Sequence, residues 1–279
     1  MPGDAHISPT AHYTSYVWYA NGMSHPALIS PRGRTFYRML QPANAAYLLL
    51  SPSANLEQGL LARHRIIDHL LDEAIRSGRV GQVVEIASGL SPRGYRFARR
   101  YPDLIYVEGD LPDMAAHKRA ALEGAGLVGP RHHVTVINAL ADEGPQSLAS
   151  ESKRLLDPTR GTAIITEGLI GYFDLDAVHG MWRRFASVLR GYPRGLYLAD
   201  LFDGGETAGP AVRGFQALLG AFTRRQVFAH YAQGDEVLGA ARAAGFADAR
   251  VHEPREYRDV LALPGVERGQ VVRILEGIS

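Results

Sequence analysis

Five short apolar runs alternate with helical segments between residues 83 and 202, and this alternation limits the fold more than any other feature. The runs read VVEIA, LIYVEGD, HHVTVINAL, GTAIITEGL and GLYLADLF. Strands that alternate with helices of this length build βαβ units, whose strands lie parallel in one sheet. We therefore expect an α/β fold with a doubly wound, mostly parallel sheet. The segment SPRGYRFARRY is expected to be a helix with Ser91 as N-cap and Pro92 at the first helical position, and further helical stretches are expected after residue 210.

The two ends of the chain follow other patterns. Residues 55–81, NLEQGLLARHRIIDHLLDEAIRSGRVG, have apolar side chains at helical spacing, and Gly78 is the expected end of that helix. Aromatic residues crowd the stretch HYTSYVWYANGMSHP ahead of it. We expect residues 1–80 to form an N-terminal helical cap or lid of the same domain, and residues 81–279 to form the core. FADARVHEP and GQVVRILEGI are expected to pair as a C-terminal antiparallel hairpin at the sheet edge.

Composition narrows the possible partners and cofactors. The formal net charge of +1 argues against a nucleic-acid partner, and the absence of cysteine excludes thiolate-based sites. No apolar run is long enough to span a membrane, and no His, Asp or Glu cluster has metal-ligand spacing. The N-terminus lacks the basic and apolar regions of a signal peptide. We expect a cytoplasmic protein that acts on a small molecule and holds no metal.

Polar or small residues follow four of the expected strands. In open, Rossmann-like α/β sheets, ligands bind beyond the carboxyl ends of the strands. An acid after the second strand suits the two hydroxyls of a ribose. The first loop, ASGLSPRG, is not GxGxxG, so a nucleoside without a pyrophosphate fits better. The alternatives are a tight strand-to-helix turn and a helix-capping role for the acid. The strand-end residues are Ala87-Ser88-Gly89, Asp110, Asn138-Ala139 and Glu167-Gly168.

These motifs resemble a known family. VVEIASGLSPRGYRF, YVEGDLPDMAAHKRA, HHVTVINAL and ITEGLIGYFD look like the successive motifs of class I S-adenosylmethionine-dependent methyltransferases. They are most similar to the leucine carboxyl methyltransferase family, which includes bacterial O-methyltransferases of polyketide pathways. The resemblance covers roughly residues 55–205 and implies S-adenosylmethionine as the cofactor.

The resemblance also implies roles for single residues. Gly89 would pass under the methionine part of the cofactor, and Asp110 would hold the ribose. Asn138 stands beside the adenine, where the family usually has Asp. Arg63 would grip the methionine carboxylate, and Glu167 would lie near the amino end. The expected cofactor-binding residues are Arg63, Ala87, Ser88, Gly89, Asp110, Leu111, Asn138, Ala139, Glu167 and Gly168.

Three functions remain open at this point. The first is methyl transfer to a carboxylate or hydroxyl oxygen in natural-product metabolism. The second takes S-adenosylmethionine as the sole substrate and cyclises it to azetidine-2-carboxylate with release of methylthioadenosine, behind an aromatic lid. The third is a non-catalytic module that binds the cofactor. An NAD-dependent dehydrogenase is a further alternative, but the loop that would bind a pyrophosphate is missing, which counts against it. The candidate catalytic residues are Tyr172, Asn138, Tyr19 and Tyr16. A hydroxyl acceptor would benefit from a general base, for which His25, His133, His179 and Glu167 are candidates by position.

Overall fold

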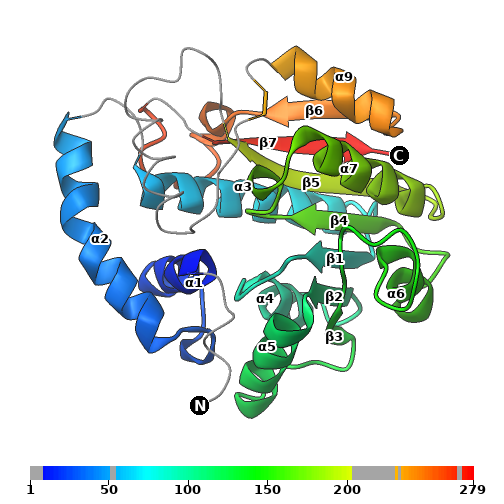
Figure 1. The fold of residues 1–279 in the computed structure, drawn as a ribbon, viewed down its shortest axis with the longest axis horizontal. Coiled ribbons are helices and arrows are strands. Elements are labelled where there is room, and N and C mark those ends of the chain that lie inside the picture. The colour runs from blue at the N-terminus through cyan, green and yellow to red at the C-terminus, as the bar shows by residue number, and fades with distance from the viewer. Residues whose placement is uncertain (1–8, 51–54, 203–229, 232–233, 269–271) are drawn as a thin grey trace.

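The computed structural model describes residues 9–50, 55–202, 230–231, 234–268 and 272–279. Its centre is a seven-stranded sheet with the order β3-β2-β1-β4-β5-β7-β6 (Figure 1). The strands are β1 (Gln82–Ile86), β2 (Ile105–Asp110), β3 (His132–Val136), β4 (Thr162–Thr166), β5 (Gly195–Phe202), β6 (Asp248–His252) and β7 (Val272–Ile278). β1 pairs in parallel with both β2 and β4, so the strand order reverses between β1 and β4. The expected doubly wound, mostly parallel sheet is confirmed.

The last two strands form the expected antiparallel hairpin at the sheet edge. β7 inserts between β5 and β6 and runs antiparallel to both. Ala199 of β5 faces Leu275 of β7, which in turn faces Val251 of β6.

Helices cover both faces of the sheet. α3 (Leu56–Arg76), α4 (Arg93–Arg100) and α5 (Pro112–Gly124) lie on one face, and α6 (Leu148–Leu155), α7 (Leu175–Leu189) and α9 (Gly234–Ala244) lie on the other. Ile66 and Leu70 of α3 belong to the same core cluster as Val83 and Ile165 of the sheet. Trp182 and Phe185 of α7 pack on the opposite face. α3 therefore belongs to the helical layer that packs on the sheet. The division of the chain at residue 80 stays a prediction.

The N-terminal cap consists of α1 (Pro9–Ala20), the short helix η1 (Pro26–Leu28) and α2 (Pro31–Leu50). α1 lies at the edge of the sheet toward which β1 and β4 point, and α2 packs against α1 (Figure 1). Ala11 of α1 packs on Leu90 and Met114, which follow β1 and β2. α1 therefore covers part of the strand ends at which a ligand is expected.

The residues at the two ends of α3 have the capping and turn geometry that their types favour, whereas the start of α4 differs slightly from the expectation. Asn55 and Gln58 form a reciprocal capping box at the start of α3, and Gly78 after its end has a φ of 70°. α4 begins at Arg93, one residue later than the Ser91-Pro92 start favours, although Ser91 Oγ still accepts from the Arg93 amide at 3.3 Å. Helices expected after residue 210 fall largely on 203–229, outside the described residues.

The described residues include neither a helix that could span a membrane nor a cluster of metal-binding side chains. None of the helices placed there is long and apolar enough to cross a membrane. Likewise, those residues contain no group of three His, Cys, Asp or Glu side chains that could hold a metal ion.

Candidate functional site

The loop after β1 has an unusual backbone. Ala87 has a φ of 52° and Gly89 a φ of 49°, a conformation that few non-glycine residues adopt. Lys118 of α5 stabilises this loop. Its ammonium pairs with Glu108 of β2 and donates to the Ser88 carbonyl at 3.4 Å. Ser88 Oγ is buried, and no group in the described part of the chain bonds to it. The loop is thus held through its backbone, and one buried hydroxyl is left without a partner in the described residues.

Asp110, at the end of β2, joins that loop to the next one. Its carboxylate accepts from the Gly89 amide and from the Leu111 amide, both at 2.7 Å. Burial raises the pKa of Asp110, and the two amides act in the opposite direction. Each carboxylate oxygen can accept a second hydrogen bond, so Asp110 keeps capacity for a pair of hydroxyls.

Arg63 of α3 lies at the ends of β4 and β5. Its Nε donates to Glu167 at 3.0 Å, and its Nη1 donates to Asp200 at 2.8 Å. Burial disfavours the charge on Arg63, but the carboxylates of Asp200 and Glu167 outweigh it and raise the pKa of the guanidinium. Within the described residues nothing accepts from Nη2, so one nitrogen of a permanently charged group stays open.

Gly168 makes room for that open nitrogen. It has a φ of 70°, and a Cβ built on it would lie 3.0 Å from Arg63 Nη2. Its amide donates to Asp200 at 2.6 Å. A glycine therefore fits this position for two reasons, conformation and space.

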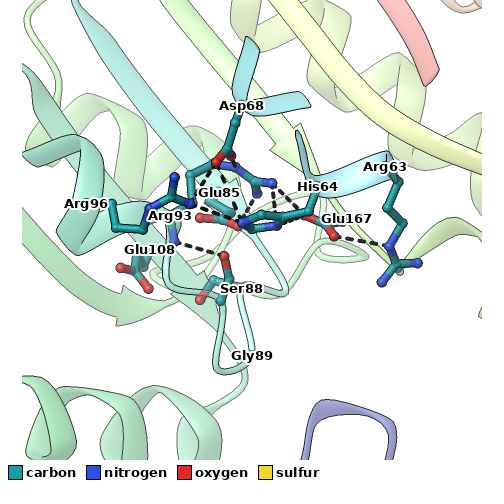
Figure 2. Close-up of polar contacts among 12 residues, drawn as sticks. Arg63, His64, Asp68, Glu85, Ser88, Gly89, Arg93, Arg96, Glu108 and Glu167 are labelled. Atoms are coloured by element: carbon teal, nitrogen blue, oxygen red, sulfur yellow. Dashed lines mark hydrogen bonds and ion pairs between the residues drawn. The ribbon is translucent and has the colours of Figure 1, made fainter. Parts of the chain in front are cut away.

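Glu167 lies between Arg63 on one side and a buried cluster of charges on the other (Figure 2). Its second oxygen is 2.8 Å from His64 Nδ1 and 2.5 Å from Arg93 Nη2. Burial opposes ionisation, but His64, Arg93 and Arg63 together hold the pKa of Glu167 far below its ordinary value. Both oxygens already bind protein cations, so the expected contact between Glu167 and the cofactor's amino end stays a prediction.

Arg93 connects this cluster to the sheet. The side chain is fully buried and donates to Glu85 of β1 and Asp68 of α3, each at 2.6 Å. Trp18 of α1 packs on the His64 ring with 4.8 Å between ring centroids. The cap therefore touches the same network that holds Glu167.

The tyrosines that were candidates for catalysis lie in two places. Tyr16 contacts Tyr19 and Tyr37 of α2, with ring centroids 5.7 and 5.1 Å apart, so it lies between α1 and α2. Tyr172, in η2 (Ile170–Tyr172), donates to Thr10 at 3.2 Å and thus joins α1 to the segment after β4. The catalytic roles of these tyrosines stay predictions.

Asn138 follows β3 and uses part of its side chain within the protein. Its side-chain Oδ1 accepts from the backbone N–H of Leu140 at 3.0 Å. Its backbone N–H donates to the carbonyl of Gln146. Ala139 is partly buried against the core. The Asn138 side-chain NH₂ is the group left for a ligand, and its catalytic role also stays a prediction.

Two of the three histidines that were candidates for a base, His25 and His179, have partners away from the proposed site. His25 accepts from the Ala27 amide at the start of η1, and His179 lies 2.9 Å from the Tyr231 hydroxyl. Burial lowers the pKa of His133 on β3. The structure shows no contact from these histidines to Arg63 or Asp110 in the described residues.

The sequence did not single out some of the residues that complete the site. These are His64, Arg93, Lys118 and Asp200. Only Asp200 left a visible signal, since it is the sole charged residue in the run GLYLADLF. Charged residues are rare inside buried strands and call for a partner.

Comparison with known proteins settles the family. The sequence model described as leucine carboxyl methyltransferase matches residues 25–186. The chain belongs to the leucine carboxyl methyltransferase family. The match includes Arg63, Asp110 and Glu167, whereas Tyr16, Tyr19 and Asp200 lie outside it.

The individual relatives match over part of their length. A candidate S-adenosyl-L-methionine-dependent methyltransferase from Mycolicibacterium gilvum is 38% identical over 120 residues, which is 43% of this chain and 37% of that one. One from Mycolicibacterium smegmatis is 32% identical over 155 residues, 54% of this chain and 49% of that one. The aligned part thus spans less than half the length of either relative.

Solved structures agree on the fold. A candidate methyltransferase from Thermobifida fusca superposes with a TM-score of 0.66, 16% identity, and coverage of 99% of this chain and 97% of that chain. A DUF574 family protein from Streptomyces avermitilis gives a TM-score of 0.67 and 12% identity, with 98% of each chain covered. At these identities the similarity shows the fold alone.

Proposed function

We propose that the chain binds S-adenosylmethionine and catalyses methyl transfer to an oxygen atom of a small molecule, either a carboxylate or a hydroxyl. One observation carries this proposal. Asp110, an acid with spare acceptor capacity, and Arg63, with an open Nη2, lie at the carboxyl ends of strands on either side of the strand-order reversal. They are the opposite charges needed for a ligand with ribose hydroxyls at one end and a carboxylate at the other.

The remaining groups fit the same ligand. Gly89 and the unpartnered Ser88 hydroxyl form the floor between the two ends. The Asn138 side-chain NH₂ can donate to a ring nitrogen of adenine. The cofactor supplies a methyl group on a positively charged sulfur. Family membership supports the assignment, as do relatives described as S-adenosylmethionine-dependent methyltransferases.

The protein's part in such a reaction is to hold the reactants and exclude water. Positioning a nucleophile against a bound electrophile supplies much of the rate in a displacement of this type. α1 lies against the β1 loop through Ala11 and against η2 through Thr10, so it closes one side of the site. A carboxylate acceptor is ionised at neutral pH and needs no base, which favours it over a hydroxyl.

The acceptor and its setting are finer parts of the proposal. We assign the acceptor to natural-product metabolism because the chain resembles O-methyltransferases of polyketide pathways. A cytoplasmic enzyme with a small-molecule substrate, and without a nucleic-acid or membrane partner, agrees with the net charge of +1 and the absence of cysteine.

Equilibrium binding tests the cofactor assignment. Titration with S-adenosylhomocysteine is expected to give saturable binding, and Arg63→Gln is expected to weaken it about tenfold or more, since a charge-assisted hydrogen bond is lost. The control is Glu276→Gln, which removes a carboxylate of β7 that pairs with His252 of β6. Absence of binding by the unmodified chain would contradict the proposal.

Mass spectrometry tests the reaction. The protein is incubated with S-adenosylmethionine alone and then with a panel of small carboxylates and phenols. Methyl transfer predicts stable cofactor in the first incubation, and S-adenosylhomocysteine with a methylated acceptor in the second. Methylthioadenosine and azetidine-2-carboxylate formed without any acceptor would replace methyl transfer by self-cyclisation.

A further inference from the structure

We infer that Asp200 is a positioning residue that fixes the Arg63 guanidinium so that its Nη2 faces the carboxylate of the bound cofactor. The inference rests on the proposed function and adds a residue that lies outside the segment matched by the family. Asp200 is near the end of β5 and is only 3% exposed. A carboxylate this deeply buried needs partners, and it has them on both oxygens.

The two oxygens of Asp200 bind two different parts of the site, the Arg63 guanidinium and the Gly168 backbone. Oδ2 accepts from Arg63 Nη1 at 2.8 Å, and Oδ1 accepts from the Gly168 amide at 2.6 Å. Gly168 is the residue whose missing side chain leaves room for Nη2. One carboxylate therefore fixes both the guanidinium and the backbone beside its open nitrogen.

A second contact is needed because one contact cannot orient a long side chain. Glu167 binds Arg63 only at Nε, 3.0 Å away, which leaves the outer end of the guanidinium free to swing. Asp200 binds a different nitrogen and comes from a different strand. Because the guanidinium is planar, contacts at Nε and Nη1 fix the direction of Nη2.

The partners of Glu167 and Asp200 differ, which separates the roles of the two acids. Glu167 contacts two arginines and one histidine, and its pKa lies far below the ordinary value. Arg63 is the only side-chain cation that contacts Asp200 in the part of the chain the structure describes. A buried ion pair of this kind adds little net stability compared with an apolar pair of the same size. Stability alone therefore does not require an acid in the apolar run GLYLADLF.

The test compares two ligands that differ in the amino-acid part. S-adenosylhomocysteine carries the carboxylate, whereas methylthioadenosine has the same nucleoside and no carboxylate. The measured quantity is the ratio of their dissociation constants, methylthioadenosine over S-adenosylhomocysteine, by calorimetry on the full chain. In Asp200→Asn the amide can still accept from Gly168, but its NH₂ cannot accept from Arg63 Nη1. We expect the ratio to fall about tenfold, while the affinity for methylthioadenosine changes less than threefold.

Three further variants and one reserve variant complete the design. Arg63→Gln alone is expected to lower the ratio, and adding Asp200→Asn to it is expected to lower the ratio no further, because Asp200 acts through Arg63. Glu276→Gln is the matched control, since it removes a carboxylate from the neighbouring strand β7 and should leave the ratio unchanged. Circular dichroism checks folding. Should Asp200→Asn not fold, Asp200→Ser removes the same charge with a smaller group and is measured in the same way.

The outcomes separate the two proposals. An equal loss of affinity for both ligands in Asp200→Asn, or an unchanged ratio, would overturn the positioning role and leave cofactor binding intact. A further fall of the ratio when Asp200→Asn is added to Arg63→Gln would show that Asp200 does not act through Arg63. Failure of the unmodified chain to bind either ligand would instead remove the proposed function itself.

Discussion

Arg63 is held at two of its three nitrogens before a ligand arrives. Its contacts with Glu167 and Asp200 come from segments more than 100 positions away in the chain. An arginine side chain loses about 2 kcal/mol of rotamer entropy when it is fixed in one conformation. Because folding has already fixed it, less of that cost falls on ligand binding.

Gly168 provides a test of this arrangement at the level of one residue. Gly168→Ala would place a Cβ 3.0 Å from Arg63 Nη2 on a backbone with a φ of 70°. We expect it to lower the free energy of unfolding by about 1–2 kcal/mol, the cost of a left-handed alanine, and to weaken S-adenosylhomocysteine binding. Urea denaturation and calorimetry measure the two effects.

Gly124→Ala is the control for that substitution. Gly124 ends α5, has no atom within 4 Å of an added Cβ, and does not have a positive φ. Alanine there should leave binding unchanged and raise stability slightly. Equal effects at the two glycines would contradict a specific role for Gly168.

Single residues of the site were partly predictable. Asp110 ends one apolar strand and Glu167 directly follows another, and a strand end is where an α/β sheet binds its ligand. Asp200 could not be paired with Arg63 from the sequence, because the two are 137 positions apart and neither has a local pattern that names the other. The left-handed conformation of Ala87 also has no signal, since alanine rarely adopts it.

At the level of elements, Glu167 connects β4 to α3 and α4 through His64, Arg63 and Arg93. Its pKa is lower in the folded protein than the ordinary value of 4.5. An acid with a depressed pKa contributes stability that is complete above its unfolded pKa and is lost as the pH falls below it. Part of the acid sensitivity of the fold should therefore come from this one carboxylate.

Glu167→Gln is expected to show this loss directly. At pH 7 it should lower the free energy of unfolding by on the order of 3 kcal/mol, because buried cations lose their partner. Between about pH 5 and pH 3 its stability should change less steeply with pH than that of the unmodified chain. Urea denaturation at several pH values gives both slopes. Glu143→Gln, at an exposed carboxylate, is the control, and a profile parallel to the unmodified chain would exclude Glu167 as the source.

The start of α3 is a second test at this level, because α3 carries Arg63 and His64. Asn55→Ala removes the side chain that accepts from the Gln58 amide at 2.9 Å. We expect a loss of about 1 kcal/mol, the usual value for a helix N-cap, measured as a lower urea midpoint. Lys153→Ala on the exposed side of α6 should change stability by less than 0.5 kcal/mol. Equal effects of the two substitutions would show that the capping box does not stabilise α3.

Element types were largely predictable because their sequence patterns are local. Alternation between apolar runs and helical periods predicted the strands β1 to β5 and the helices between them. The start of α4 was misplaced by one residue because Pro92 suits a first helical turn, whereas Pro92 precedes the helix here. Small displacements of this kind are expected where helices begin.

For the whole molecule, the order of strands and helices along the chain predicted the type of sheet. It did not predict where the N-terminal cap lies. Right-handed βαβ crossovers and a terminal hairpin leave few strand orders, and the observed order agrees with them. By contrast, α1 reaches the β1 loop through Ala11 and His64 through Trp18, contacts that join segments far apart in the chain. The aromatic residues near the N-terminus predicted a lid, and the structure shows where α1 lies; its action as a lid stays a prediction.

This position of α1 leads to a prediction about the whole molecule. Because α1, the β1 loop and the Asp110 loop surround the proposed ligand, S-adenosylhomocysteine should slow amide hydrogen exchange in all three together. At a hundred times its dissociation constant the ligand should also add about 2.7 kcal/mol to the free energy of unfolding. Hydrogen exchange with mass spectrometry locates the protection, and the hairpin β6–β7, at the edge away from β1, is the internal control. Protection of the β1 loop without α1 would show that the cap does not close over the ligand.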